Sequence, residues 1–350
     1  MKKVLTIGGA TQDIFIKYEN PQMLRIHSKK HKKEFVTFEE GSKIEIQDLS
    51  YSTGGGATNS GTSFSRLGFD VSTIFKTGDD TQANMIIEKL KKENIDISHI
   101  KKSSTLLTGA SIIIPCLSGD RTVLVYRGSN TQLKKEDINK DLIANCDQLY
   151  ITSLSGKSSK LLGYITEIAK KHNVPIATNP GSSQLAAGAP QLRDSLPNID
   201  IFILNSDEAS KFMHTLVQAG KQLKPDIMHE NIYFNLQQYF KEVLKRGPKI
   251  AAVTNGAEGV YVAKENTIYF HPSMKTKIVS TLGAGDSFGS CFVASLSKGK
   301  SLKESLLRGI INATSVISYL DAKTGLLTND ELEKRAAKIT TKHIIKFPLS

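Results

Sequence analysis

A glycine-rich turn that ends in an acidic residue is the segment best suited to chemistry. Gly283-Ala284-Gly285-Asp286 precedes a helix-like stretch at 287–296. The glycines let the backbone turn sharply, so the first amides of this helix and the positive end of its dipole point at one place. Such a place binds phosphate. Asp286 beside it is a candidate proton acceptor, which indicates phosphoryl transfer to a hydroxyl, although an acid there can also only complement the dipole.

The composition is that of a protein with a large buried core. The chain has 350 residues, 39% of them hydrophobic, and no stretch approaches the roughly 18 apolar residues of a membrane span. The apolar run near residue 4 is too short for a signal peptide and is predicted to be the first buried strand. Cys116, Cys146 and Cys291 have neither metal-ligand nor disulfide spacing. We therefore expect a cytoplasmic protein with no membrane partner.

The net charge of +12 raises the question of a nucleic-acid partner, and the densest basic run is Lys29-Lys30-His31-Lys32-Lys33. The other lysines are spread along the chain as on solvated helix faces, and no aromatic stacking series accompanies them. We expect no nucleic-acid binding, and instead surface lysines with some attraction for anionic substrates.

Short apolar runs alternate with amphipathic helical patterns over most of the length. This alternation predicts an α/β fold with a mostly parallel sheet covered by helices on both faces. The predicted strands are 3–7, 71–75, 148–151, 175–178, 201–204 and 250–254, and the predicted helices are 57–67, 83–92, 158–171, 231–246 and 302–318.

Two segments, 14–52 and 105–125, break this rhythm. Their alternation of apolar and polar residues, for example at 43–47, and the turn-forming pair Gly119-Asp120 predict antiparallel strands. They are expected to form a small accessory sheet, a lid that keeps water from a transferring phosphate. Because no repeat or proline-rich linker interrupts the chain, we expect one domain over 1–350.

A second glycine cluster, Gly54-Gly55-Gly56, precedes Asn59 where a helix is predicted to begin. Backbone can pass close to a ligand there, and Asn59 offers both a donor and an acceptor. The glycine spacing is not that of a dinucleotide site, because Asn59 occupies the third position. Gly156-Lys157-Ser158 is not a P-loop either, since Ile151 stands where the first glycine is needed.

The motifs, taken in order, resemble the ribokinase-like (PfkB) carbohydrate kinase family over residues 3–325. The specific signature is 280–288, Ser-Thr-Leu-Gly-Ala-Gly-Asp-Ser-Phe, and a weaker one runs from Gly54 to Gly68. The resemblance implies a three-layer αβα sandwich with a β-sheet lid. Other matching segments begin at Asp13, Gly128, Asn205 and Thr254.

The resemblance also implies roles at the acceptor. Asp286 matches the catalytic base of the family. The amides of Gly283, Ala284 and Gly285 match the anion hole for the γ-phosphate of ATP. The acceptor hydroxyls would be held by Asp13, Gly55 and Asn59.

On the nucleotide side, Asn205 and Glu208 match an element that organises Mg²⁺ and the phosphates, with Glu208 reaching the metal through water. Thr254, Gly256 and Gly259 match a turn beside the nucleotide, although a plain hairpin turn has the same glycines. Thr281 is also expected to contact ATP.

Two departures from the family limit what is implied. Ser280 stands where an aspartate usually helps to hold a monovalent cation, so activation by such a cation is doubtful. The glutamate of ribose kinases is missing from 151–154, which weakens ribose as the acceptor. We expect a sugar or sugar derivative; the alternatives are a nucleoside kinase and a ligand-binding protein without turnover. A homodimer through the lid is also expected.

Overall fold

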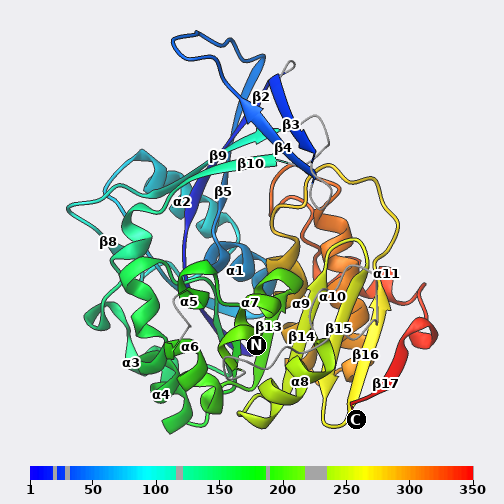
Figure 1. Ribbon diagram of the computed structural model, residues 1–350. Helices are drawn as coiled ribbons and strands as arrows, with labels where there is room; N and C mark the ends of the chain where they lie inside the picture. Colours follow the sequence, from blue (N-terminus) through cyan, green and yellow to red (C-terminus); the bar gives the residue numbers. More distant parts are fainter. Residues whose placement is uncertain (19–21, 28–31, 116–120, 187–189, 217–234, 350) are drawn as a thin grey trace.

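The computed structural model describes residues 1–349 except 19–21, 28–31, 116–120, 187–189 and 217–234. The strands of its main sheet are β1 (Lys3–Ile7), β6 (Asp70–Ile74), β11 (Gln148–Ile151), β12 (Ile176–Thr178), β13 (Ile201–Asn205), β14 (Ile250–Asn255), β15 (Gly259–Lys264), β16 (Thr267–Pro272) and β17 (Ile345–Pro348). Their order is β17-β16-β15-β14-β13-β12-β11-β1-β6. The six from β6 to β14 run parallel. The last three, β15, β16 and β17, pair antiparallel and lie at the right of Figure 1.

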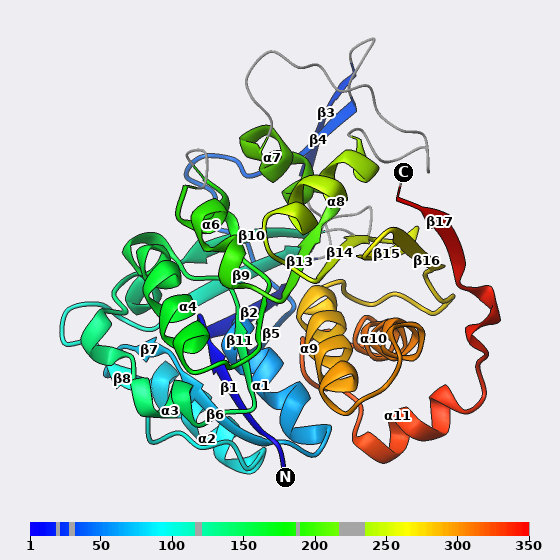
Figure 2. The same cartoon turned by 90° about the horizontal axis from the view of Figure 1, so that it is seen from below.

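Helices cover both faces of this sheet, as Figure 2 shows for α7 and α8 on one side and α9 and α10 on the other. One face carries α3 (Lys140–Ala144), α4 (Leu162–Lys171), α6 (Pro190–Ser195), α7 (Ser206–Leu216) and α8 (Leu236–Lys245). The other face carries α1 (Gly56–Arg66), α2 (Thr81–Lys92), α9 (Ala284–Ser297), α10 (Leu302–Val316) and α11 (Asn329–Ala336). The short elements are α5 (Ser182–Leu185) and the 3₁₀ helices η1 (Gly128–Thr131), η2 (Lys135–Asp137), η3 (Gly156–Leu161), η4 (Leu196–Asn198) and η5 (Thr341–His343).

The two faces give two apolar cores, one under each helical layer. Val4 packs in one core and Leu5 in the other, because successive residues of a strand point to opposite faces. The strands are therefore apolar on both sides, which is why the sequence predicts them well. All six predicted strands are present within one residue of their expected ends, and the predicted α/β fold is confirmed.

The predicted helices are present with two differences. Residues 231–234 of the predicted helix 231–246 lie outside the described residues, and α8 begins at Leu236. The predicted helix 158–171 starts as the 3₁₀ helix η3 and becomes α-helical only in α4. Ser158 explains this, because its hydroxyl donates to Asn130 O at 2.8 Å and accepts from Leu133 N at 2.9 Å.

A small sheet stands at the top of the molecule in Figure 1. Its strands, in the order β10-β9-β2-β5, come from both segments that break the main pattern, which confirms the predicted accessory sheet. They are β2 (Thr11–Lys17), β5 (Asp48–Gly54), β9 (Gly109–Pro115) and β10 (Arg121–Tyr126). Two further pairs are the hairpin β3 (Gln22–His27) with β4 (Lys32–Thr37), and β7 (Lys76–Thr77) with β8 (Lys101–Lys102).

The predicted strand at 43–47 is wrong. Residues 42–46 have no regular structure, and Ile44 and Ile46 are both exposed, so their alternation buries no face. The strand begins at Asp48, which pairs with Lys17 at the end of β2. Among the described residues, β2 ends at Lys17, and no strand of the small sheet lies opposite residues 42–46.

Some sequence features fall outside the described residues: the turn Gly119-Asp120, Cys116 and residues 29–31 of the basic run. Cys146 and Cys291 are buried thiols, and burial raises their pKa to about 11 and about 12. In the described part of the chain, none of the helices has the length and apolar character to cross a membrane.

Candidate active site

The expected site residues gather at the carboxyl ends of the parallel strands, where ligands bind in open α/β sheets. β1 leads through a short loop to Asp13 in β2, and β5 leads into α1, which carries Asn59. β13 and β14 end at Asn205 and just after Thr254, two residues that are direct partners across the sheet. The first turn of α9 supplies Asp286.

The start of α9 has the geometry of an anion-binding turn. Gly283 has a left-handed conformation with φ of 76°, and a Cβ there would lie 2.3 Å from Ala322 Cβ, so only glycine fits. The amides of the first helical turn have no partner within the helix. Among the described residues, the Ala284 amide makes one long bond, of 3.4 Å to Thr281 O. A Cβ at Gly285 would meet no atom within 4 Å, so this side of the turn is open.

Asp286 lies against Asn59, one of the residues expected to hold the acceptor. Its Oδ2 accepts a 2.8 Å hydrogen bond from Asn59 Nδ2. Burial raises the pKa of Asp286, while the hydrogen bond from Asn59 and the positive charge of Lys323 act against that rise. A carboxylate whose pKa is raised in this way holds a proton more readily than one in water, as a general base requires.

Asp13 is buried beside the glycines of the first cluster. Thr11 Oγ1 donates to Asp13 Oδ1 at 3.1 Å, and a Cβ on Gly54 would lie 2.0 Å from Asp13 Oδ2. Burial raises the pKa of Asp13, the charge of Lys323 lowers it, and Asp286 contributes a smaller rise. Gly55 has φ of 93°, and a Cβ there would come within 2.5 Å of Gly9 O. Glycines therefore allow β1, β5 and α1 to meet at Asp13.

Asn130 has a structural role for which the sequence alone offered no reason. Its Oδ1 accepts from Ala10 N at 2.9 Å, and its Nδ2 donates to Ala10 O at 2.8 Å. The side chain thus replaces a neighbouring strand for the residue just before β2. It fixes the point at which the small sheet leaves the main sheet.

Asn205 and Glu208 form a capping box at the start of α7. Asn205 N donates to Glu208 Oε2 at 3.0 Å, and Glu208 N donates to Asn205 Oδ1 at 2.8 Å. Burial raises the pKa of Glu208, and the negative charge of Asp286 adds to the rise. The capping box explains both residue types structurally, and it holds a carboxylate within the electrostatic field of Asp286.

A cavity of about 340 Å³ lies beside the start of α9. Its walls are mostly apolar, with Val260, Ile310 and Ile317 among the lining residues. Among the residues predicted to bind ATP and its metal, Gly256, Gly259 and Thr281 line it, whereas Asn205, Glu208 and Thr254 do not. The glycines also form the β14–β15 hairpin turn, where a Cβ on Gly259 would lie 2.2 Å from His271 O.

Two arginines, one in β10 and one just after it, connect the small sheet to the main body of the protein. Arg121 of β10 donates through Nη1 to the hydroxyl of Thr281, next to the glycine turn. Arg127, just after β10, donates to Ser155 Oγ at 3.0 Å and Ser182 Oγ at 3.1 Å. The small sheet is therefore in polar contact with the residue two positions before the glycine turn.

Lys323 is a residue of the site that the sequence did not reveal. It is only 7% exposed, and its ammonium donates to Thr53 O, Thr53 Oγ1 and Thr58 Oγ1 at 2.7, 2.8 and 2.9 Å. Because 46 residues of the chain are lysine or arginine, no pattern in the sequence distinguishes this lysine. It lies between β5, α1 and the loop that packs on Gly283.

Comparisons with known proteins agree with this geometry. The sequence model of the pfkB family carbohydrate kinases matches residues 25–329. Ribokinase of Staphylococcus aureus is 29% identical over 279 residues, covering 76% of this chain and 84% of the relative.

Solved structures of the same fold cover almost all of the chain. Arabidopsis thaliana ribokinase complexed with ribose and ATP matches with a TM-score of 0.77 at 18% identity, over 97% of this chain and 100% of that one. Methanocaldococcus jannaschii nucleoside kinase, an archaeal member of the ribokinase family, matches with a TM-score of 0.74 at 19% identity, over 97% and 99%. The fold is thus ribokinase-like, and the chain belongs to the pfkB family of carbohydrate kinases, phosphotransferases that act on hydroxyl groups.

Proposed function

We propose that this protein transfers the γ-phosphate of ATP to a hydroxyl of a sugar or sugar derivative, with Asp286 as the general base. The observation that carries this proposal is the 2.8 Å hydrogen bond between Asn59 Nδ2 and Asp286 Oδ2. It joins the residue expected to hold the acceptor to the carboxylate beside the phosphate-binding turn. One hydroxyl can therefore contact the base and face the phosphate at once.

The transfer is a single displacement. Asp13, Gly55 and Asn59 orient the acceptor, and Asp286 takes the proton as the hydroxyl oxygen bonds to the γ-phosphorus. The bond from that phosphorus to the β,γ-bridging oxygen breaks, and ADP leaves. The amides of Gly283, Ala284 and Gly285 stabilise the charge on the transferring group. No covalent enzyme intermediate is required.

The remaining predicted residues belong to the nucleotide. The cavity of about 340 Å³ has the size and apolar walls that suit a purine base, with Gly256, Gly259 and Thr281 at its border. Thr254 lies one residue from the end of β14, where it supports this turn.

Magnesium fits the residues present. Among the described residues, no three side chains of His, Cys, Asp or Glu gather into a metal site. Mg²⁺ commonly binds through phosphate oxygens and water with one or two carboxylates, and Glu208 is suitably placed to contact its water. When bound, the ion would neutralise phosphate charge.

The test is an assay of ADP formation by purified protein with ATP and Mg²⁺ against a panel of sugars, sugar acids, sugar phosphates and nucleosides. We expect acceptor-dependent ADP and a phosphorylated product with a sugar or sugar derivative. A preference for nucleosides would replace the acceptor class. ADP formation that no acceptor stimulates would refute the proposed transfer.

A further inference from the structure

Lys323 has surroundings that are unusual for a buried ammonium. All three of its hydrogen bonds go to neutral oxygens, of Thr53 and Thr58. Three bonds use its three donors, so the group is fully satisfied, but no direct ion pair with a described residue neutralises its charge. A charge held at a site of low dielectric acts on other charges over a longer distance than one in water.

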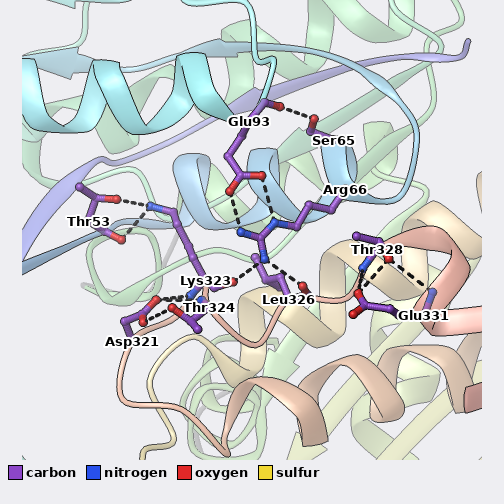
Figure 3. A network of polar contacts seen from close by, with 10 residues as sticks. All are labelled: Thr53, Ser65, Arg66, Glu93, Asp321, Lys323, Thr324, Leu326, Thr328 and Glu331. Atoms are coloured by element: carbon purple, nitrogen blue, oxygen red, sulfur yellow. Dashed lines mark hydrogen bonds and ion pairs between the residues drawn. The ribbon is translucent and has the colours of Figure 1, made fainter.

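The loop that carries Lys323 is fixed from several sides, as Figure 3 shows. Arg66 of α1 donates through Nη1 to Lys323 O and to Leu326 O, both at 2.9 Å, and its other nitrogens bind the carboxylate of Glu93. Asp321 Oδ1 accepts from the amides of Lys323 and Thr324 at 2.8 and 2.9 Å. The ammonium therefore has a defined position.

The same loop connects both halves of the site. Ala322 packs against Gly283, so closely that a Cβ on the glycine would overlap it. Lys323 extends the other way to Thr53 in β5 and Thr58 in α1 (Figure 3 shows its bonds to Thr53). Thr58 also donates to Gly54 O at 2.7 Å, and Asn59 follows it directly. One loop thus holds the acceptor side and the phosphate side together.

The positive charge of Lys323 changes the pKa of the carboxylates of the site. Lys323 lowers the pKa of both Asp13 and Asp286, against the effect of burial. Conversely, Asp13, Asp321 and Asp286 favour the charged ammonium, while burial and Lys89 of α2 oppose it, and its own pKa falls to about 7. The groups that face Lys323 are therefore three acids and one base.

We propose that Lys323 is a positioning residue of the phosphotransfer site, an internal cation that holds β5 and α1 against the loop behind the glycine turn. Its positive charge also favours the ionised form of Asp286. The three hydrogen bonds of its ammonium go to Thr53 and Thr58, so its effect on the transfer is exerted through these residues and through Asp286. This inference rests on the proposed function for its catalytic consequence, whereas the electrostatic coupling to Asp286 does not depend on turnover.

The direct test is a titration of the Asp286 carboxyl by ¹³C NMR in protein labelled at the aspartate carboxyl carbons. The signal is assigned by its loss in Asp286→Asn. In Lys323→Met we expect Asp286 to titrate at higher pH than in the unmodified protein. Lys298→Met is the matched control, because Lys298 caps the other end of α9 and donates to Leu67 O and Asn329 Oδ1. It should leave the titration unchanged.

Steady-state kinetics with the acceptor that the ADP-formation assay identifies give a second readout. In Lys323→Met the acid limb of kcat/KM should move to higher pH, lowering kcat/KM at pH 6 by on the order of tenfold, with ATP affinity within a few-fold. Thr53→Val removes one hydroxyl that accepts a hydrogen bond from Lys323 but keeps the ammonium. It should therefore raise the KM for the sugar substrate without moving the acid limb of kcat/KM.

The outcomes separate the two proposals. An unchanged Asp286 titration in folded Lys323→Met overturns the role of Lys323, whether or not the protein turns over. If Lys323→Met does not fold, Lys323→Arg replaces it as the test variant, because it keeps the positive charge. An Asp286 titration in Lys323→Arg that differs from that of the unmodified protein would then overturn the role of Lys323. A shifted titration without any acceptor-dependent transfer would contradict the proposed function alone.

Discussion

Asn59 Nδ2 donates to Asp286 Oδ2 across 2.8 Å, although the two residues are 227 positions apart in the chain. The other amide atom of Asn59, its Oδ1, is buried and has no hydrogen-bond partner among the described residues. The amide nitrogen of Asn59 donates to the carboxylate, and this hydrogen bond favours the ionised form of Asp286.

We predict that Asn59→Ala raises the pKa of Asp286, because the charged form loses a hydrogen bond. The acid limb of kcat/KM should move to higher pH, so activity falls more at pH 6 than at pH 8. Asn145→Ala, which removes an amide that donates to Asp141 O in the capping turn of α3, is the control. An acid limb at the same pH in both variants would contradict the assigned contact.

Ser280 predicts little dependence on monovalent cations. The side chain is buried, and its hydroxyl accepts from Leu282 N at 3.2 Å, so it supplies a turn contact rather than a carboxylate. We expect turnover in potassium and in sodium to agree within about twofold, and Ser280→Asp to create a dependence on potassium. Strong potassium stimulation of the unmodified protein would show that carbonyl oxygens suffice.

We propose that the small sheet acts as a lid. Arg121 already connects β10 to Thr281, so an acceptor bound between them should slow hydrogen exchange in β2, β5, β9 and β10 together. Exchange measured with and without the acceptor tests this, with α4 as the internal reference. Slower exchange only in the loops of the main sheet would contradict the proposal that the small sheet closes over the acceptor.

The outer face of the small sheet predicts self-association. Tyr51, Leu124 and Tyr126 are about half exposed there, at 52%, 54% and 47%. A second copy would cover them and extend the sheet at its edge strands, β5 and β10. We expect a dimer mass by light scattering and a monomer for Leu124→Asp. A monomeric mass for the unmodified protein at micromolar concentration would exclude this dimer.

Lys323 also predicts how stability depends on pH. Lysine has an ordinary pKa of 10.5, and burial lowers that of Lys323 to about 7 in the folded state. Between these values the unfolded chain binds more protons than the folded one, so this group makes the free energy of unfolding rise with pH. Urea unfolding at pH 7, 8 and 9 should show a smaller rise in Lys323→Met than in the unmodified protein. Equal slopes would refute the lowered pKa.

The sequence predicted the main sheet because its strands are apolar on both faces and short, as Leu5 and Ile7 in one core and Val4 in the other illustrate. It failed at 43–47, where alternation occurs but the described part of the chain supplies no partner strand. A local pattern shows which side chains are apolar, whereas a strand also needs a neighbouring strand to pair with. β2 ends at Lys17, opposite Asp48, so it does not continue alongside residues 43–47.

The residues of the candidate site also differ in whether the sequence alone could predict them. The turn at Gly283 and the glycines before Asn59 are local signals, since positive φ and close approach demand glycine. Lys323 has no local signal, because its role comes from oxygens of Thr53 and Thr58, which lie more than 250 positions away. Such contacts follow only from the three-dimensional arrangement.

The central claim is that Asp286 accepts the proton of the acceptor hydroxyl. It is tested most directly by single-turnover transfer from γ-labelled ATP in Asp286→Asn, with ATP affinity measured calorimetrically. Asp207→Asn, which alters an exposed acid in the first turn of α7, is the matched control. We predict that Asp286→Asn lowers the transfer rate by on the order of 10² to 10⁴ with ATP affinity within a few-fold, while Asp207→Asn transfers normally. Transfer at the unmodified rate by Asp286→Asn would contradict the account.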